Sequence, residues 1–305
     1  MKNIFIISLF GVIGLFDVCL AACPPADLSG DCFVNYEDAA SISEWWLEDC
    51  NATNNFCEGA DFDTSGQVDP NDLALLTSDW LKNYAFVTTW DTNLGDGTTV
   101  TLALAGTVDA YIDWGDGSPV EHVTTPGPHG HDYGVDGIYT VSVSGSVTEY
   151  NSLSNGGTNS ERAKLISVDN WGQLGFISLS RAFEGCESLV SVPTTSEGIE
   201  TVTDMRNMFR NADAFNQDIG GWDTSSVTDM GYMFMSASAF NGNIGSWDTS
   251  SVTNMGFMFR SASAFNQDLS GWCVTEITSE PPNFDTGASS WILPNSRPIW
   301  GTCPP

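Results

Sequence analysis

Residues 202–226 read VTDMRNMFRNADAFNQDIGGWDTSS, residues 227–251 read VTDMGYMFMSASAFNGNIGSWDTSS, and residues 252–274 read VTNMGFMFRSASAFNQDLSGWCV. The same residue types return with a period of 25 residues. A fixed period of roughly 20–29 residues is typical of leucine-rich-type solenoids, in which each repeat buries its apolar side against its neighbours. We therefore expect an α/β solenoid with this period over residues 202–276.

The recurring apolar residues of each repeat are predicted to form a stacked core instead of a platform for a cofactor or a sugar. In the first repeat they are Met205, Met208, Phe209, Ala212, Phe215, Ile219 and Trp222. A degenerate copy, LSRAFEGCESLVSV (179–192), precedes them and places Cys186 where the repeats have alanine. Cys186 is therefore predicted to be a buried free thiol.

Polar positions of the repeats fall into two classes. Asn216, Asn241 and Asn266 recur after each second phenylalanine, and such a ladder is expected to satisfy backbone groups in a turn. Other positions vary between repeats and are candidates for a solvent-facing binding surface. They are Arg206, Gly231 and Gly256 in one set, and Arg210, Met235 and Arg260 in another.

Near the N-terminus, residues 26–47 read ADLSGDCFVNYEDAASISEWWL and residues 60–81 read ADFDTSGQVDPNDLALLTSDWL. Each copy begins with an acidic loop and continues with apolar spacing that favours a helix. The spacing of oxygen-bearing residues matches the loop that calcium needs. It predicts two Ca²⁺ sites, with ligands Asp27, Ser29, Asp31, Phe33 (carbonyl), Asn35 and Asp38 in the first and Asp61, Asp63, Ser65, Gln67 (carbonyl), Asp69 and Asp72 in the second. A pair of Asx turns that cap two helices is the alternative.

From residue 86 to residue 150, Val, Thr, Ile and Tyr alternate with polar residues between Gly, Pro and Asp. YIDWGDGSPVEHV (111–123) holds Asp116-Gly117 between alternating runs, which predicts a β-hairpin. His122, His129 and His131 all lie in this region without a carboxylate or cysteine at fixed ligand spacing. We interpret them as structural, and Asp116 as a turn residue.

The N-terminus has the pattern of a secretory signal over residues 1–22, with Lys2, an apolar run and small residues before Cys23. Leu20-Ala21-Ala22-Cys23 also resembles a lipobox, which would acylate Cys23. Export agrees with the other cysteines, since they can form Cys273–Cys303 and two pairs within residues 23–57. The order of pairing remains open.

The chain has 9 Lys and Arg against 39 Asp and Glu, a net charge of −30, and no run of basic residues. Duplex nucleic acid and anionic membranes are therefore excluded as expected partners. No stretch after the leader is apolar enough for a transmembrane segment. The excess of carboxylates fits either solubility or the binding of hard cations.

Three resemblances give these parts family names. The duplicated acidic loop with Asp38 and Asp72 at its last position resembles dockerin domains, which implies an EF-hand-like α head and calcium-dependent docking to a cohesin-like module. The DWGDGS segment (113–118) looks like a PKD-type β-sandwich, and residues 160–305 resemble BspA-like leucine-rich-repeat surface proteins. Together they imply a multidomain chain: signal peptide 1–22, dockerin-like domain 23–85, β-sandwich 86–150, degenerate repeat or cap 151–201, repeats 202–276 and C-terminal cap 277–305.

The sequence contains no GxSxG, P-loop or HExxH motif, no triad, and no pair of carboxylates that stands out. We therefore expect a non-catalytic, secreted or cell-surface binding and adhesion protein with calcium-dependent docking. Its partner would be a protein, with a surface protein or a glycan as the ligand of the repeats. The alternative is a non-catalytic carbohydrate-targeting subunit of a polysaccharide-degrading assembly.

Overall fold

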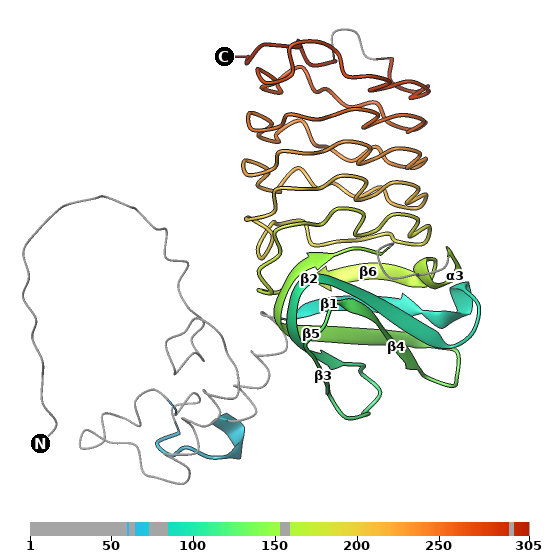
Figure 1. The fold of residues 1–305 in the computed structure, drawn as a ribbon, viewed down its shortest axis with the longest axis vertical. Helices are drawn as coiled ribbons and strands as arrows, with labels where there is room; N and C mark the ends of the chain where they lie inside the picture. Colours follow the sequence, from blue (N-terminus) through green and yellow to red (C-terminus); the bar gives the residue numbers. More distant parts are fainter. Residues whose placement is uncertain (1–59, 61–64, 73–84, 153–158, 293–295, 305) are drawn as a thin grey trace, which may run out of the picture. The chain divides into compact units, whose positions relative to one another are not determined.

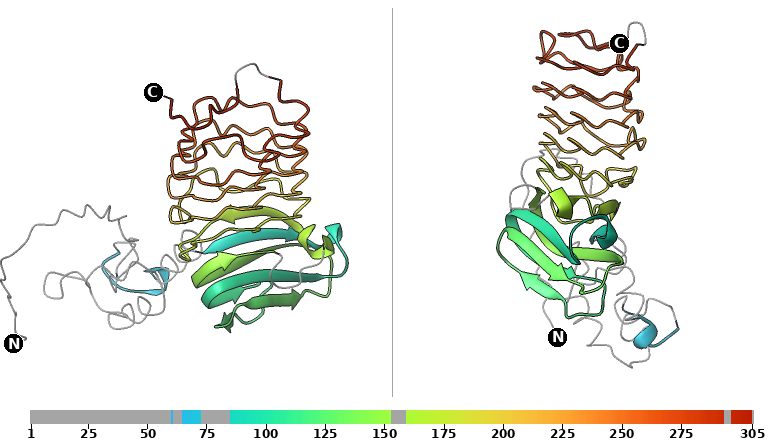
Figure 2. Two further views of the ribbon diagram at one scale, coloured as in Figure 1. Left: turned by 45° about the horizontal axis from the view of Figure 1, so that its top comes forward. Right: turned by 90° about the vertical axis from the view of Figure 1, so that its right-hand side faces the viewer.

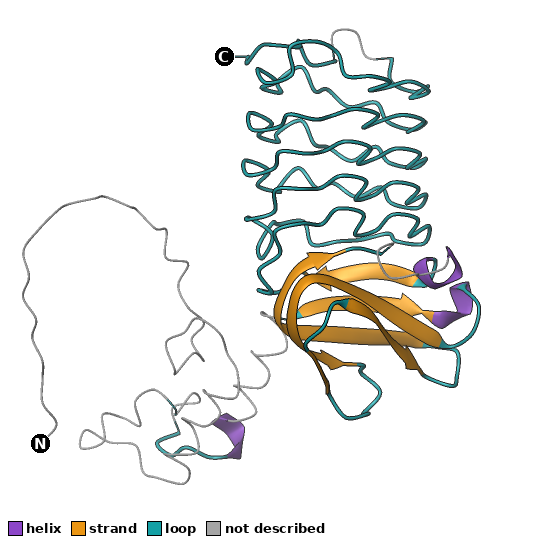
Figure 3. Cartoon of the chain, viewed as in Figure 1, coloured by secondary structure: helices purple, strands orange, loops and turns teal. Residues whose placement is uncertain are grey.

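The computed structural model describes residues 60, 65–72, 85–152, 159–292 and 296–304. The chain divides into two compact units, Met1–Leu76 and Thr77–Pro305. The second unit begins with an antiparallel sheet and continues as a stack of turns that ends near the C-terminus (Figure 1). Figure 3 shows how little of the described part of this unit is helical.

The sheet is built from six strands, and its order is β3-β2-β5-β1-β6, with β4 beside β2. The strands are β1 (Phe86–Asp91), β2 (Thr99–Asp113), β3 (Glu121–Val123), β4 (Gly127–Asp132), β5 (Ile138–Tyr150) and β6 (Leu165–Asn170). A 3-10 turn, η2 (Thr92–Leu94), follows β1, and a short helix, α3 (Asn159–Arg162), precedes β6. Every pairing between these strands is antiparallel.

The predicted hairpin around Asp116-Gly117 is confirmed. It joins β2 to β3, with Ile112 opposite Glu121. Gly115 and Gly117 have φ values of +76° and +83°, which side-chain-bearing residues rarely adopt. A Cβ on Gly115 would also lie 2.1 Å from the Thr140 carbonyl oxygen, so the position has no room for a side chain.

Each 25-residue repeat forms one turn of a solenoid, seen side-on in Figure 2. Between Trp171 and Ile292 the described backbone has no α-helix and no extended strand. Neighbouring turns meet through isolated parallel bridges, Ser178 to Asp204, Asp204 to Asp229, and Asp229 to Asn254. The first bridge of this column, from Glu149 in β5 to Ser178, joins the sheet to the turns.

Between the bridges, residues with a left-handed backbone conformation form hydrogen bonds from one turn to the next. Tyr232 and Phe257 have φ values of +62° and +61°, and Asn207 has +56°. Each of the three donates its backbone N–H to a carbonyl of the next turn, as Tyr232 does to Gly256 at 2.8 Å. The tight turn thus satisfies its backbone groups between repeats, without a helix.

The predicted core is confirmed, because all the recurring Met, Phe, Ala, Ile and Trp residues are buried. The aromatic rings stack from turn to turn, as in Phe215 with Phe240 at 5.8 Å and Trp222 with Trp247 at 6.3 Å between ring centroids. The asparagine ladder is confirmed as well: Asn216 Oδ1 accepts from Asn241 N at 2.7 Å, and Asn241 Oδ1 accepts from Asn266 N at 2.8 Å.

The sheet and the turns share one core. Phe86 of β1 packs against Tyr150 of β5 at 5.1 Å between ring centroids. Tyr150 packs in turn against Phe183 at 6.0 Å, and Phe183 packs against Phe209 at 5.7 Å. A single cluster of buried apolar side chains runs from Phe86 to Trp291. The sheet therefore caps the N-terminal end of the solenoid.

The prediction of a multidomain chain with an EF-hand-like α head, a β-sandwich and an α/β solenoid is wrong. Among the described residues, the regular secondary structure is mainly an antiparallel sheet, and very little of it is helix. Residues 86–150 and β6 belong to one sheet, the only one among the described residues. Phe86 and Tyr150 of this sheet pack against Phe176 and Phe183 of the first turns. The repeats are rich in Gly, Asn, Asp and Ser, which favour turns over helices.

Two cysteine predictions are confirmed. Cys273 and Cys303 form a disulfide that ties the C-terminal segment to the last repeat. Cys186 is a buried free thiol. The proposed signal peptide and the cysteines of residues 23–57 lie outside the described residues.

Candidate binding surface

The structure describes only part of the second acidic loop. Ser65, Gln67, Asp69 and Asp72 belong to this part. The other predicted calcium ligands lie outside the described residues: Asp27, Ser29, Asp31, Phe33, Asn35, Asp38, Asp61 and Asp63. No group of three or more His, Cys, Asp or Glu residues suited to a metal ion is found among the described residues.

The described part of this loop has the local geometry that its sequence predicts. Gly66 at the sixth position has φ +95°, and Val68 at the eighth is fully buried. Asp72 Oδ2 accepts a hydrogen bond from Asp69 N at 2.8 Å, and Asp69 Oδ1 accepts one from Asn71 N at 2.7 Å. These bonds cap the helical turn that begins at Pro70, a role open to both interpretations of the loop.

The histidines of the sheet are held by neighbouring groups. His122 Nε2 lies 2.8 Å from Asp109 Oδ1, and His131 Nε2 lies 2.7 Å from Asp116 Oδ2. The Asp116 side chain also accepts from Ser118 N at 2.9 Å, which confirms its role in the turn. Hydrogen bonds from Ser118 and then His131 hold the pKa of Asp116 well below its ordinary value.

The most distinctive surface feature is a line of four side chains along the turns, which we call the arginine–aromatic column: Arg206, Tyr232, Phe257 and Arg260. Tyr232 and Phe257 stack face to face, with ring centroids 4.6 Å apart and planes 3° apart. The Arg206 guanidinium carbon lies 5.2 Å from the Tyr232 ring centroid, and that of Arg260 lies 5.8 Å from the Phe257 centroid. Both arginines are exposed, and both rings are half-buried.

The backbone explains why these rings leave the core. Tyr232 and Phe257 are left-handed residues between buried neighbours, Gly231 and Met233 in one turn and Gly256 and Met258 in the next. The equivalent residue of the first repeat, Asn207, is also left-handed but is buried, so the two larger rings reach further toward the surface than the asparagine does. A bulky residue rarely adopts this conformation, so the two rings are held there by the inter-turn hydrogen bonds.

The variable positions predicted to face solvent are confirmed only in part. Arg206 and Arg260 are exposed, and Met235 is half-buried. Gly231 and Gly256 are buried, because they pack in the space between turns. Tyr232 and Phe257 were not among the predicted surface residues. Their departure from Asn207 at the same repeat position was the available signal.

Arg210 belongs to an ion-pair group around the buried Glu184 at the start of the solenoid. Its Nη1 lies 3.2 Å from Glu184 Oε1, and Arg181 Nε lies 3.9 Å from Glu184 Oε2. Glu184 is 7% exposed. Arg181, Arg206, Arg210 and Arg260 are four of the nine Lys and Arg residues of the chain. The solenoid turns thus hold a large share of its scarce cations.

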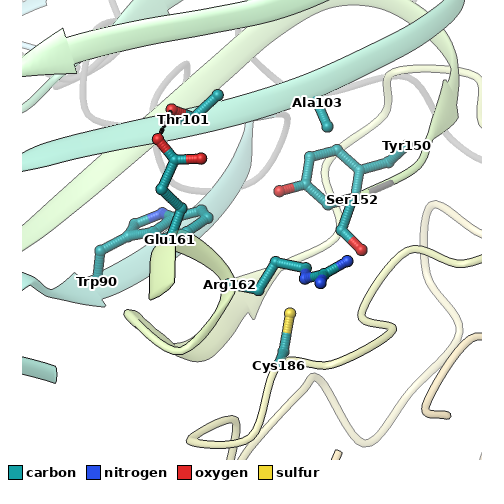
Figure 4. A pocket seen from close by; sticks show the side chains of 8 residues that line it. All are labelled: Trp90, Thr101, Ala103, Tyr150, Ser152, Glu161, Arg162 and Cys186. Carbon is teal, nitrogen blue, oxygen red and sulfur yellow. Dashed lines mark hydrogen bonds between the residues drawn. The ribbon is translucent and has the colours of Figure 1, made fainter. Parts of the chain in front are cut away.

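A small cavity of about 20 Å³ lies where the sheet meets the first turn. Figure 4 shows Arg162 extending from α3 between Ser152 and Cys186. Burial raises the pKa of the Cys186 thiol to about 12, which Arg162 only partly offsets. A thiol with that pKa is not a nucleophile near neutral pH. We therefore interpret the cavity as a small packing defect between the sheet and the first turn.

Comparisons with known proteins match only the solenoid. Residues 177–290 match a family described as a Mycoplasma protein of unknown function, DUF285. No curated protein and no solved structure matches the chain. None of the helices among the described residues is long and apolar enough to cross a membrane.

Proposed function

We propose that this chain is a secreted or cell-surface, non-catalytic binding protein whose solenoid recognises a protein partner through the arginine–aromatic column. The observation that supports this most is the contrast within the repeats. Their core positions are nearly identical, whereas the column positions change from turn to turn and place Arg, Tyr and Phe at the surface. Arg and Tyr are the residue types enriched at the centres of protein interfaces.

The geometry of the column favours protein over sugar as its ligand. A sugar ring stacks on an open aromatic face. The inner faces of Tyr232 and Phe257 cover each other at 4.6 Å, and the Arg206 guanidinium lies over the Tyr232 ring. The column therefore offers ring edges and guanidinium N–H groups, which suit apolar and hydrogen-bonding contacts with a protein surface.

The test is an affinity capture in which the full chain is immobilised and exposed to the surface and secreted proteins of the cells that produce it. The variant R206S/R260S should lose at least about tenfold in affinity for the captured partner. The control S226A/S251A changes two exposed residues that are not part of the column and should bind as the wild type does. Equal binding by the arginine variant would reject the column as the contact surface.

The acidic loops add a second element to this proposal, calcium-dependent attachment through the N-terminal region. Calcium titration of the full chain should show two sites, and D63A should remove one of them. Ligand binding to the native state stabilises it by RT ln(1+[L]/Kd), so chelation should lower the melting temperature of the region that holds the loops. A calorimetric titration with no heat of binding would contradict this part of the proposal.

A further inference from the structure

A second surface feature is the turn of the solenoid farthest from the sheet (Figure 1). We call residues 281–288 of this turn the terminal arc. Asn283 and Gly287 have φ values of +51° and +85°. They repeat the pair of left-handed residues that the turn below has at Phe257 and Ser261. The terminal arc therefore keeps the backbone of a repeat, although its sequence, PPNFDTGA, departs from the repeat pattern.

Hydrogen bonds between turns run in one direction along this side of the solenoid. In each turn the two left-handed residues and the residue midway between them donate their N–H groups to carbonyl oxygens of the next turn. In the last repeat, Phe257, Phe259 and Ser261 donate to the terminal arc over distances between 2.8 and 3.0 Å. The donors of the three preceding turns are Arg181, Phe183 and Gly185; Asn207, Phe209 and Asn211; and Tyr232, Phe234 and Ser236. Each of these turns thus takes three acceptors from the turn that follows it.

The terminal arc has the same three donors, but the described chain has no further turn to accept from them. They are the N–H groups of Asn283, Asp285 and Gly287, and none has a hydrogen-bond acceptor among the described residues. Asn283 and Gly287 are exposed, and Asp285 is half-buried. At the other end of the solenoid, Ser152 N donates to the Arg181 carbonyl oxygen at 3.2 Å, so the sheet pairs the backbone there. The described fold therefore closes the ladder at the sheet and leaves it open at the terminal arc.

Side chains close the apolar core beside the terminal arc. Trp300 packs edge-on against Phe284, with ring centroids 4.9 Å apart, and the Arg297 guanidinium carbon lies 4.2 Å from the Trp291 ring centroid. Phe284 and Trp291 are buried as a result, whereas Ile299, next to Trp300 in the chain, is 64% exposed. The end of the solenoid thus combines three free backbone donors with a short apolar edge.

The spacing of the donors indicates what fits them. One turn below, the acceptors for the equivalent donors are the carbonyl oxygens of alternate residues, Pro282, Phe284 and Thr286. An extended chain presents the carbonyl oxygens of alternate residues along one edge, and it can add to such a row as a further strand. Two copies of the terminal arc do not fit each other, because both present donors.

We propose that the terminal arc binds an extended peptide segment of a partner protein, which adds as a strand to the end of the solenoid. Three alternate carbonyl oxygens of the peptide accept from Asn283, Asp285 and Gly287, and one of its apolar side chains contacts Ile299. The arginine–aromatic column shares no residue with the terminal arc, so this binding does not depend on the column.

The test begins with random linear peptides displayed on phage and selected on the immobilised full chain, and the best peptide is synthesised for calorimetric titration. The variant D285P removes the central N–H group. Its matched control is D285A, because both variants lose the ion pair between Asp285 and Arg297 but only D285P loses the donor. D285A should bind the peptide as the wild type does. D285P should bind it about threefold to tenfold more weakly, as expected for one lost hydrogen bond.

Two further measurements use the wild-type chain and so do not require D285P to fold. Replacing one amide of the peptide by an ester weakens its carbonyl oxygen as an acceptor. When the amides are replaced one at a time, affinity should fall at three alternate residues only. Hydrogen exchange of residues 281–288 in the full chain should also become slower when the peptide is bound.

The proposal would be overturned by selection of no linear peptide, by equal binding to D285P and D285A, or by ester effects without alternation. Self-association of the full chain that D285P abolishes and D285A keeps would put a second copy in place of the peptide and would also overturn it. R206S/R260S separates this proposal from that of the column, because it should leave peptide binding unchanged. Loss of peptide binding in that variant would place the peptide on the column and reject the terminal arc.

Discussion

Cys186 occupies the position that alanine holds in the following three turns, Ala212, Ala237 and Ala262. All four residues are buried in the same column of the core. The thiol therefore acts as a slightly larger alanine, and its raised pKa of about 12 follows from its burial.

We predict that the Cys186 thiol does not react with Ellman's reagent in the native protein and reacts promptly in urea. C186A should cost about 1 kcal/mol or less, close to the value of one buried methylene group. Equilibrium urea unfolding measures this cost. Rapid labelling of the native thiol would contradict the placement of Cys186 in the core.

Lys164 is the buried cation of the sheet. Its side chain is fully buried, and Nζ donates to the carbonyl oxygens of Asp96 and Thr99, both at 2.8 Å. It thereby fastens the loop between η2 and β2 to the start of β6.

We predict that K164M lowers the free energy of unfolding by about 1–3 kcal/mol, because it leaves two carbonyl groups without their donor. R260M is the matched control, since it also removes a cation but at an exposed position, and it should stay within about 0.5 kcal/mol of the wild type. Urea unfolding of both variants measures the difference. Equal stability of K164M and the wild type would contradict this prediction and would mean that water donates to the two carbonyl oxygens in place of Lys164.

At the scale of elements, each repeat depends on bonds to its neighbours. Asn241 Oδ1 accepts from Asn266 N at 2.8 Å and from Gln267 Nε2 at 3.0 Å, while Asn241 N donates to Asn216 Oδ1. Asn241 thus connects three turns, through its side chain on one side and its backbone N–H on the other.

We predict that N241A destabilises the solenoid by about 1–2 kcal/mol, since two donors lose their acceptor. N241D keeps an acceptor oxygen at this place and should lose less. Thermal unfolding by circular dichroism ranks the two variants. A smaller loss for N241A than for N241D would show that water replaces the ladder.

The repeat sequence predicts which residues are buried better than it predicts the shape of the backbone. The 25-residue period and the recurring Met, Phe and Trp residues identify the core, and the asparagine ladder follows from the need to pair backbone groups. The prediction of a helix in each repeat is wrong. The polar half of the repeat is rich in Gly, Asn, Asp and Ser, whose side chains hydrogen-bond to the backbone of turns and so favour turns over helices. Left-handed Tyr232 and Phe257 could not be predicted, since sequence does not show φ angles.

At the scale of the whole molecule, the sheet and the turns form one body with one core. The alternating pattern of residues 86–150 correctly predicts strands and the hairpin at Asp116-Gly117. It cannot show that Phe86 and Tyr150 pack against the first turns, because a second sheet would also present apolar residues to them. Glu149 bridges to Ser178 and Tyr150 packs against Phe183 at this junction of sheet and turns.

Hydrogen exchange of F86A in the full chain tests this union of sheet and solenoid most directly. Phe86 lies in β1, and a buried Phe-to-Ala change costs about 3–5 kcal/mol. We predict that F86A lowers the protection of peptides from β5 and from residues 179–212 by the same free energy. A loss confined to the strands, with residues 179–212 protected as in the wild type, would show that sheet and solenoid are independent domains.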